Sequence, residues 1–359
     1  MLYEIAEADF DKVRPLTKEQ PLVLAVDAVL DGTCPGAVWA DDPDVFNAAI
    51  VETPEGHYLV GDAEAGGFAP SLMKFITKTL SPGGRGENWW WFYLRCPSDA
   101  WTETMRRTLP SERAVEKPRE FYVCDELTFD WRGKVPAGFE LVRVDERLIA
   151  RDDLENVDHL RSFAKGNFGS VEQFLNHGFA FCVIHDDTIV SECFTDNVSR
   201  GRCEVGVRTS GAYRRRGLGS LVVARTVDWA LSNGLDQVGW HCLRYNLASA
   251  ATARKVGFRK AEDYFAFLVC GKRADASIVK GNLCLIRHEF EEAADHYTRA
   301  LDAVDAEGLS ASKFLAHRGR RTSYAFQAAS ARALAGQREL GIELVDEAIE
   351  IAGYRVGGY

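Results

Sequence analysis

The spacing of apolar residues changes from a strand period to a helix period in the second half of the chain. Residues 204–209 alternate between apolar and polar side chains with period two, which predicts a strand. From Val223 onward, apolar residues recur at i, i+4, i+7 and i+8, which predicts one buried helical face. We expect Ser220 to cap this helix with its hydroxyl group and Gly234 to end it.

Similar patterns predict regular elements on both sides of this helix. Downstream, they indicate a buried strand over 236–243, a short helix over 247–256 and a strand over 264–269. Upstream, they indicate a strand over 139–144 and a helix over 151–163. Strands and helices alternating in this way predict an α/β (α+β) fold.

A hairpin is predicted before the central strand. The apolar runs 180–184 and 189–194 flank the polar turn 185–187, and the second run leads into residues 204–209. Because hairpin strands are antiparallel, we expect a mixed, mainly antiparallel sheet flanked by helices.

The first third of the chain shows the same mixture of periods. Strands are predicted over 45–51, 58–60 and 120–130, and a helix over 70–80. The aromatic run 89–94 predicts a strand in a half-buried sheet, although an aromatic wall facing a substrate would have the same composition.

The last ninety residues are predicted to be helical. Apolar faces at helical spacing lie in 289–304, 324–334 and 340–351. Helix pairs with an alanine-rich seam resemble tetratricopeptide units, but similar segments here are spaced more widely than the usual repeat of about 34 residues. We expect this small all-α tail to bind a protein partner or a second copy of the chain, rather than only to cover the core.

Composition narrows the class of protein. The 359 residues contain 46% apolar and 27% charged residues, with a formal net charge of -10, so nucleic acid is not an expected partner. No apolar run reaches the about 18 residues that cross a membrane, and the N-terminal residues do not resemble a signal peptide. Nine cysteines without a CxxC pair argue against a disulfide framework and against a metal site. We therefore expect a cytoplasmic protein with buried thiols.

A loop with two glycines precedes the central helix. The sequence from Arg214 to Ser220 is Arg-Arg-Arg-Gly-Leu-Gly-Ser, and free backbone N–H groups at such a helix start favour an anion. It lacks the third glycine of the dinucleotide fingerprint and the Gly-Lys-Ser/Thr of the ATP-binding loop. Alone, the motif would equally fit a simple strand-to-helix turn.

Downstream residues add to this motif. Together with Asn246 and with Lys255-Val256-Gly257-Phe258, the segment Arg214–Gly219 resembles the cofactor-binding core of the GNAT superfamily of N-acetyltransferases. The resemblance spans about 138–269 and looks most like a bacterial branch with an additional N-terminal domain. It implies a degenerate GNAT-like domain over 1–135, an acetyl-CoA-binding catalytic domain over 136–270, and the helical domain over 271–359.

The resemblance also implies which residues bind acetyl-CoA. The glycine loop would hold the pyrophosphate, Asn246 would face the pantetheine arm, and a backbone N–H on the splayed strand would face the thioester carbonyl. No metal is implied. The cofactor-binding candidates are Val205, Val207, Arg214, Arg215, Arg216, Gly217, Leu218, Gly219, Ser220, Asn246 and Ser249.

Several residues are candidates for proton transfer. Glu204 is the first choice for the base, because family members carry a catalytic glutamate at this place; Glu192 and His241 are the alternatives. The tyrosine that many members use as an acid is replaced by Ala253, which leaves Tyr245 and Tyr264 as candidates, or water. Each of these side chains could instead be structural.

Together these observations predict an N-acetyltransferase that transfers an acetyl group from acetyl-CoA to a small primary amine by direct attack. Two alternatives stay open. One is an acyl-CoA-sensing module that signals through the helical tail without turnover, and the other is an enzyme that acetylates a protein or peptide.

Overall fold

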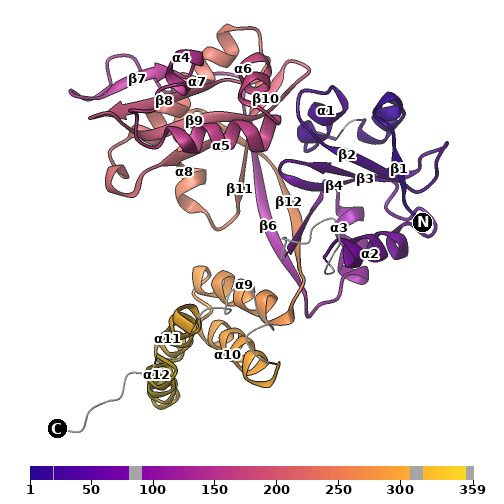
Figure 1. The fold of residues 1–359 in the computed structure, drawn as a ribbon, viewed down its shortest axis with the longest axis vertical. Coiled ribbons are helices and arrows are strands. Elements are labelled where there is room, and N and C mark those ends of the chain that lie inside the picture. The colour runs from indigo at the N-terminus through magenta and orange to yellow at the C-terminus, as the bar shows by residue number, and fades with distance from the viewer. Residues whose placement is uncertain (19, 81–90, 308–317, 353–359) are drawn as a thin grey trace. The chain divides into compact units, whose positions relative to one another are not determined.

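The computed structural model describes residues 1–18, 20–80, 91–307 and 318–352 (Figure 1). Contacts divide the chain into two compact units. The first contains Met1–Phe68, Arg95–Thr102 and Pro118–Ala266, and the second contains Ala69–Leu94, Glu103–Lys117 and Phe267–Tyr359. The three-domain division predicted from the sequence stays a prediction.

The described strands share one order, β1-β2-β3-β4-β5-β12-β6-β11-β10-β9-β8-β7. Their bounds are β1 Tyr3–Ile5, β2 Ala37–Ala40, β3 Ala48–Thr53, β4 Gly56–Gly61, β5 Trp91–Cys96, β6 Ala114–Cys124, β7 Glu140–Arg143, β8 Ala180–His185, β9 Thr188–Ser199, β10 Arg202–Thr209, β11 Gln237–Leu243 and β12 Arg259–Cys270. Apart from the parallel pair β10–β11, the strand pairs with a described register are antiparallel, as the sequence predicts.

The described helices are of two types, and α9 to α12 follow the last strand. The 3-10 helices are η1 Glu7–Thr17 and η2 Gly211–Tyr213. The α-helices are α1 Leu24–Leu30, α2 Phe68–Thr79, α3 Asp99–Thr108, α4 Glu146–Ile149, α5 Val157–Phe168, α6 Val171–His177, α7 Leu218–Ser232, α8 Leu247–Val256, α9 Arg273–Ile286, α10 Phe290–Glu307, α11 Arg318–Leu334 and α12 Arg338–Ala352.

Two cores form on opposite faces of the first unit's strands. Ala180, Cys182 and Phe194 belong to one core, together with residues of α1, β2, β3, α5 and α6. Phe181 and Cys193 belong to the other core, which α7 and α8 cover. Successive side chains of β8 point to opposite faces of the sheet, so this strand contributes apolar side chains to both cores.

Three expectations about elements need correction. Helix α7 begins at Leu218 with Gly217 as its N-cap, at φ 82°, so the side chain of Ser220 does not cap it. The helix predicted over 151–163 is α5, which starts at Val157 because Asn156 adopts a left-handed φ of 68°. The strand predicted over 120–130 is β6, shifted toward the N-terminus by its pairing with β11. Helix α9 was not predicted.

The second unit contains the helical tail. Figure 1 shows α9 to α12 in orange and yellow, and each helix packs on the next. Their seam contains alanines 293, 294, 328 and 331 around Tyr297. Tetratricopeptide-like organisation and association through these helices stay predictions.

In β5 of the same unit, Phe92 and Leu94 are buried while Trp91 is exposed, as in a half-buried sheet. Trp89 and Trp90 lie outside the described residues.

All nine cysteine side chains are buried, as the sequence predicts. Burial raises the pKa of the Cys182 thiol to about 12. Across the described residues, no helix has the length and apolar character to cross a membrane, and no cluster of His, Cys, Asp and Glu is placed to hold a metal ion.

Candidate functional site

Strands β10 and β11 part in the middle of the first unit. Their parallel pairing joins Arg202–Glu204 to Gln237–Gly239 and stops there, although both strands continue. The backbone N–H of Ser210 donates to the carbonyl oxygen of Val190 in β9, the strand on the other side of β10. Because N–H directions alternate along a strand, those of Val207 and Val205 face the gap beside β11. The splayed strand pair is therefore present where the sequence predicts it.

A cleft of ≈ 690 Å³ opens at the N-terminus of α7. Gly217 takes a left-handed φ of 82°, and a Cβ atom on Gly219 would lie 3.3 Å from Thr209 Oγ1. Among the predicted cofactor residues, the cleft is lined by Val207, Arg214, Arg215, Gly217, Leu218, Gly219, Ser220, Asn246 and Ser249. Thr252 and Lys255, which were not among those candidates, also line it.

The three consecutive arginines have different surroundings. Arg214 Nε donates to the carbonyl oxygen of Thr209 over 3.1 Å, and Arg215 adopts a left-handed φ of 63°. Both line the cleft, whereas the guanidinium of Arg216 lies over the ring of Tyr213 at 5.1 Å and is not part of the lining. Two of the three charges therefore face the cleft.

Asn246 and Ser249 build the facing wall of the cleft. Asn246 is the N-cap of α8 and accepts the N–H of Ser249 on Oδ1 over 3.2 Å. Ser249 Oγ in turn accepts the indole N–H of Trp240 over 3.0 Å. Val205 is 5% exposed with its side chain in the α7 core, so only its backbone can face the gap.

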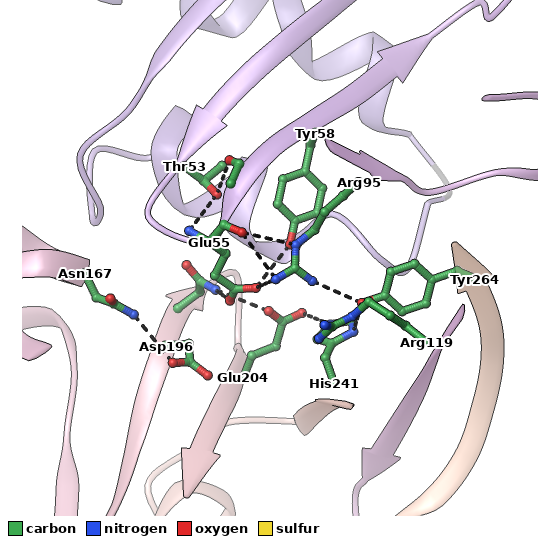
Figure 2. A network of polar contacts seen from close by, with 12 residues as sticks. Thr53, Glu55, Tyr58, Arg95, Arg119, Asn167, Asp196, Glu204, His241 and Tyr264 are labelled. Carbon is green, nitrogen blue, oxygen red and sulfur yellow. Dashed lines mark hydrogen bonds and ion pairs between the residues drawn. The ribbon is translucent and has the colours of Figure 1, made fainter. Parts of the chain in front are cut away.

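Three of the predicted proton-transfer residues form one hydrogen-bonded chain (Figure 2). Tyr264 OH lies 3.0 Å from His241 Nδ1, and His241 Nε2 lies 3.0 Å from Glu204 Oε1. The Tyr264 hydroxyl oxygen already accepts from Arg119 Nε at 2.6 Å and Arg95 Nη1 at 3.1 Å, so its single hydrogen points to His241. This pattern assigns the hydrogen of neutral His241 to Nε2, from which it donates to Glu204.

Glu55 and Arg95, from the first hundred residues of the protein, extend this hydrogen-bonded network. Glu55, in the β3–β4 turn, forms an ion pair of 2.6 Å with Arg95 Nη2 and accepts from Asn197 Nδ2 over 2.5 Å. Burial raises the pKa of the Glu55 carboxyl, but Arg95, His241 and Arg119 outweigh it and lower that pKa overall. Figure 2 shows Glu55 and Arg95 beside Glu204.

A β-bulge lies directly opposite Glu204. Asn197 pairs with Glu204 and Thr195 pairs with Val205, which leaves Asp196 as an extra residue in β9. The bulge turns Asp196 and Asn197 toward one face, because Asn197 donates to Glu204 Oε2 over 3.2 Å and Asp196 lies against Gly206.

The other two proton-transfer candidates lie outside the chain of Glu204, His241 and Tyr264. Glu192 is buried on β9 and pairs with His159 Nδ1 at 2.5 Å and Arg208 Nη1 at 3.2 Å. Tyr245 is half-buried between β11 and α8. Their predicted roles remain untested predictions.

Five polar residues of the site were not among the sequence-predicted candidates. No local motif marks them, because a turn residue, a strand arginine and a bulge residue are each common and come together only in the folded chain. The clearest available signal was the run of three consecutive polar residues at 195–197, which interrupts the alternation of the strand. The five are Glu55, Arg95, Arg119, Asp196 and Asn197.

Comparison with known proteins identifies the family and the fold of this chain. The model of the GNAT acetyltransferase family matches residues 14–267. The uncharacterized N-acetyltransferase YdfB of Bacillus subtilis (strain 168) is 26% identical over 265 residues, which is 74% of this chain and 97% of that protein. The fold resembles a GCN5-related N-acetyltransferase-like protein from Streptococcus suis with a TM-score of 0.55 and 21% identity, covering 72% of this chain and 98% of that one. The chain belongs to the GNAT acetyltransferase family.

Proposed function

We propose that this protein is an acetyl-CoA-dependent N-acetyltransferase that acts on a primary amine of a small molecule by direct attack in a ternary complex. The observation that supports it most is the cleft at the start of α7, next to the gap between β10 and β11. Acetyl-CoA, when bound, supplies the acetyl group as an activated thioester.

The cleft suits the phosphates of coenzyme A. Backbone N–H groups at a helix N-terminus favour anions, and the missing side chains of Gly217 and Gly219 let a phosphate approach the backbone closely. Arg214, Arg215 and Lys255 add positive charge to the same lining. The N–H groups of Val205 and Val207 would serve a carbonyl oxygen that gains charge during transfer.

Carboxylates on the other side of β10 suit a cationic acceptor. Glu55, Asp196 and Glu204 lie in one polar cluster, and a group of acids attracts an ammonium ion. Glu204 is only 2% exposed, and Glu55 and Arg95 lie beside it. We infer that a small amine reaches this largely buried cluster more readily than a folded protein does.

The chain from Tyr264 to Glu204 keeps that cluster ordered. Because His241 donates to Glu204, Glu204 is held as a carboxylate acceptor, and Tyr264 fixes the imidazole through Nδ1. In this arrangement Tyr264 commits its hydrogen to His241 rather than to a leaving thiolate.

Calorimetric titration with acetyl-CoA tests the cofactor site. Gly217→Asp places a carboxylate at the N-terminus of α7 and should abolish binding. Gly217→Asn is the matched control, because asparagine has nearly the same shape, tolerates the left-handed φ of 82° and carries no charge. It should weaken binding much less. Equal affinity of Gly217→Asp and wild type would contradict the assignment of the loop.

The neighbouring arginines allow a second comparison. Arg215→Gln should weaken acetyl-CoA binding by about tenfold, the size of one lost charge-assisted hydrogen bond. Arg216→Gln should change the dissociation constant by less than about twofold, because that side chain lies over Tyr213. The same titration measures both, and equal losses would show that the cleft does not distinguish the two arginines.

A screen of acceptors follows the titration. Release of free thiol with small amines supports the proposal, whereas turnover with peptides alone would favour a protein acetyltransferase. Binding of acetyl-CoA without turnover on any amine would favour an acyl-CoA sensor.

A further inference from the structure

We propose that Asp196, the extra residue of the β9 bulge, binds the ammonium group of the acceptor and takes a proton from it. The inference rests on the acetyltransferase function proposed above. It predicts that the acceptor carries a positive charge and that Asp196, rather than Glu204, contacts it.

The position of Asp196 follows from the bulge. Its carboxylate lies over the backbone of Gly206, where a Cβ atom would be 3.2 Å and 3.3 Å from its two oxygens. Gly206 stands between Val205 and Val207, whose N–H groups face the gap beside β11. The bulge therefore brings one carboxylate to the stretch of β10 where the thioester would be attacked.

Asp196 is more available than Glu204. Glu204 is 2% exposed and has both oxygens in use, one toward His241 and one toward Asn197. Asp196 is half-buried, and its Oδ1 accepts only one long hydrogen bond of 3.5 Å, from Asn167 of α5. Its Oδ2 accepts no hydrogen bond from any residue that the structure describes. A half-buried carboxylate with spare acceptor capacity suits an incoming ammonium donor.

The charges around Asp196 favour a cation there. Burial raises the pKa of the Asp196 carboxyl well above its ordinary value, and Glu55 and Glu204 raise it further, while Arg95 and Arg119 lower it. A carboxylate beside two others gains most from a positive partner. The charged groups that act on Asp196 from the surrounding elements are Glu55, Glu204, Arg95 and Arg119. Asp196 in turn helps to raise the pKa of three nearby thiols, those of Cys34, Cys193 and Cys203.

The step balances with an acyl thioester as the second reactant. The ammonium group gives one proton to an Asp196 oxygen, and the freed nitrogen lone pair forms the C–N bond as the C–S bond breaks. The departing thiolate takes the second proton from nitrogen, so the products are the amide and a free thiol. Asp196 then releases its proton to solvent. A base of this kind contributes about 10²–10⁴-fold to the rate.

The test compares the pH profiles of kcat/KM for two variants, with an amine found in the screen. Asp196→Asn should lower kcat/KM by at least about 100-fold and remove the acid limb of the profile, with acetyl-CoA affinity unchanged within about twofold, since the cleft is untouched. Glu204→Gln should keep the acid limb and move it to lower pH, because it removes a negative charge that raises the pKa of Asp196. Asp44→Asn, at an exposed position, should match wild type.

The opposite pattern would overturn the inference: an acid limb kept by Asp196→Asn and lost by Glu204→Gln would make Glu204 the base. Asp196→Glu keeps a carboxylate and should retain the acid limb at a reduced rate, which guards against a variant that merely fails to fold.

Carbon-13 NMR of labelled aspartates gives a measurement independent of turnover. The resonance absent from Asp196→Asn should titrate at higher pH than other aspartates, and an ordinary titration would contradict the proposal. A wild-type protein that acetylates no amine would instead refute the proposed function itself.

Discussion

Replacing Arg95 by methionine should lower the free energy of unfolding by about 3 kcal/mol, because it leaves the carboxylate of Glu55 buried without its ion-pair partner. The two side chains are 7% and 14% exposed, and their charged atoms are 2.6 Å apart. Tyr264 would also lose one of the two guanidinium donors that direct its hydrogen toward His241. Scanning calorimetry should show the thermal midpoint falling by about 6–12 °C.

Arg106→Met is the matched control for this prediction. Arg106 also pairs with two glutamates, Glu103 and Glu116, at 2.5 Å and 2.8 Å, but its side chain is 38% exposed. Loss of such a surface pair should cost less than about 1 kcal/mol. A double variant of Arg95→Met with Glu55→Gln should recover part of the stability, since the stranded charge is gone. Equal effects at Arg95 and Arg106 would show that burial of the pair does not matter.

Adding one methyl group at Gly206 should lower kcat by at least about tenfold, which is about 1.4 kcal/mol of transition-state free energy. A Cβ atom there would lie 2.6 Å from the ring of Phe194, closer than packed atoms approach. Phe194 cannot easily move aside, because its ring centroid lies 3.6 Å from that of Phe163. The methyl group would therefore displace either Asp196 or the strand that faces the gap.

Gly211→Ala is the control for Gly206→Ala. Gly211 precedes the same arginine loop, and a Cβ atom there would meet nothing within 4 Å. Steady-state kinetics should show little change for Gly211→Ala. For Gly206→Ala, the acetyl-CoA dissociation constant should stay within about twofold of wild type while kcat falls, because the glycine loop at the start of α7 is untouched. An unchanged kcat would mean that the space over Gly206 plays no part in transfer.

Elements with strong local signals could be predicted from the sequence. Helix α8 has the predicted bounds, 247–256, because its N-cap Asn246 and the following Gly257 are visible in the chain. The cleft at the start of α7 is lined by the predicted glycine loop and by Asn246, whose signals are also local. The N-cap of α7 was predicted three residues too late, since Gly217 rather than Ser220 occupies the cap position.

The polar cluster around Glu204 could be predicted only in part. Glu204, His241 and Tyr264 were identified separately, but their connection depends on β6, β11 and β12 lying side by side. Asp196 was missed because a bulge depends on how two strands pair, and the sequence of one strand does not show it. Arg95 and Glu55 were missed because both come from a part of the chain for which the sequence predicted no cofactor site.

The extra residue in β9 also resets which positions of that strand face which core. Before the bulge, the even-numbered Glu192 and Phe194 point to the α5 side, where they meet His159 and Phe163. After it, the odd-numbered Asn197 and Ser199 point to that side. A mutational scan at every second residue would therefore change positions on the α5 side along half of the strand and disturb the α7 core along the other half. The choice of positions to substitute along β9 therefore follows two numbering rules, one on each side of Asp196.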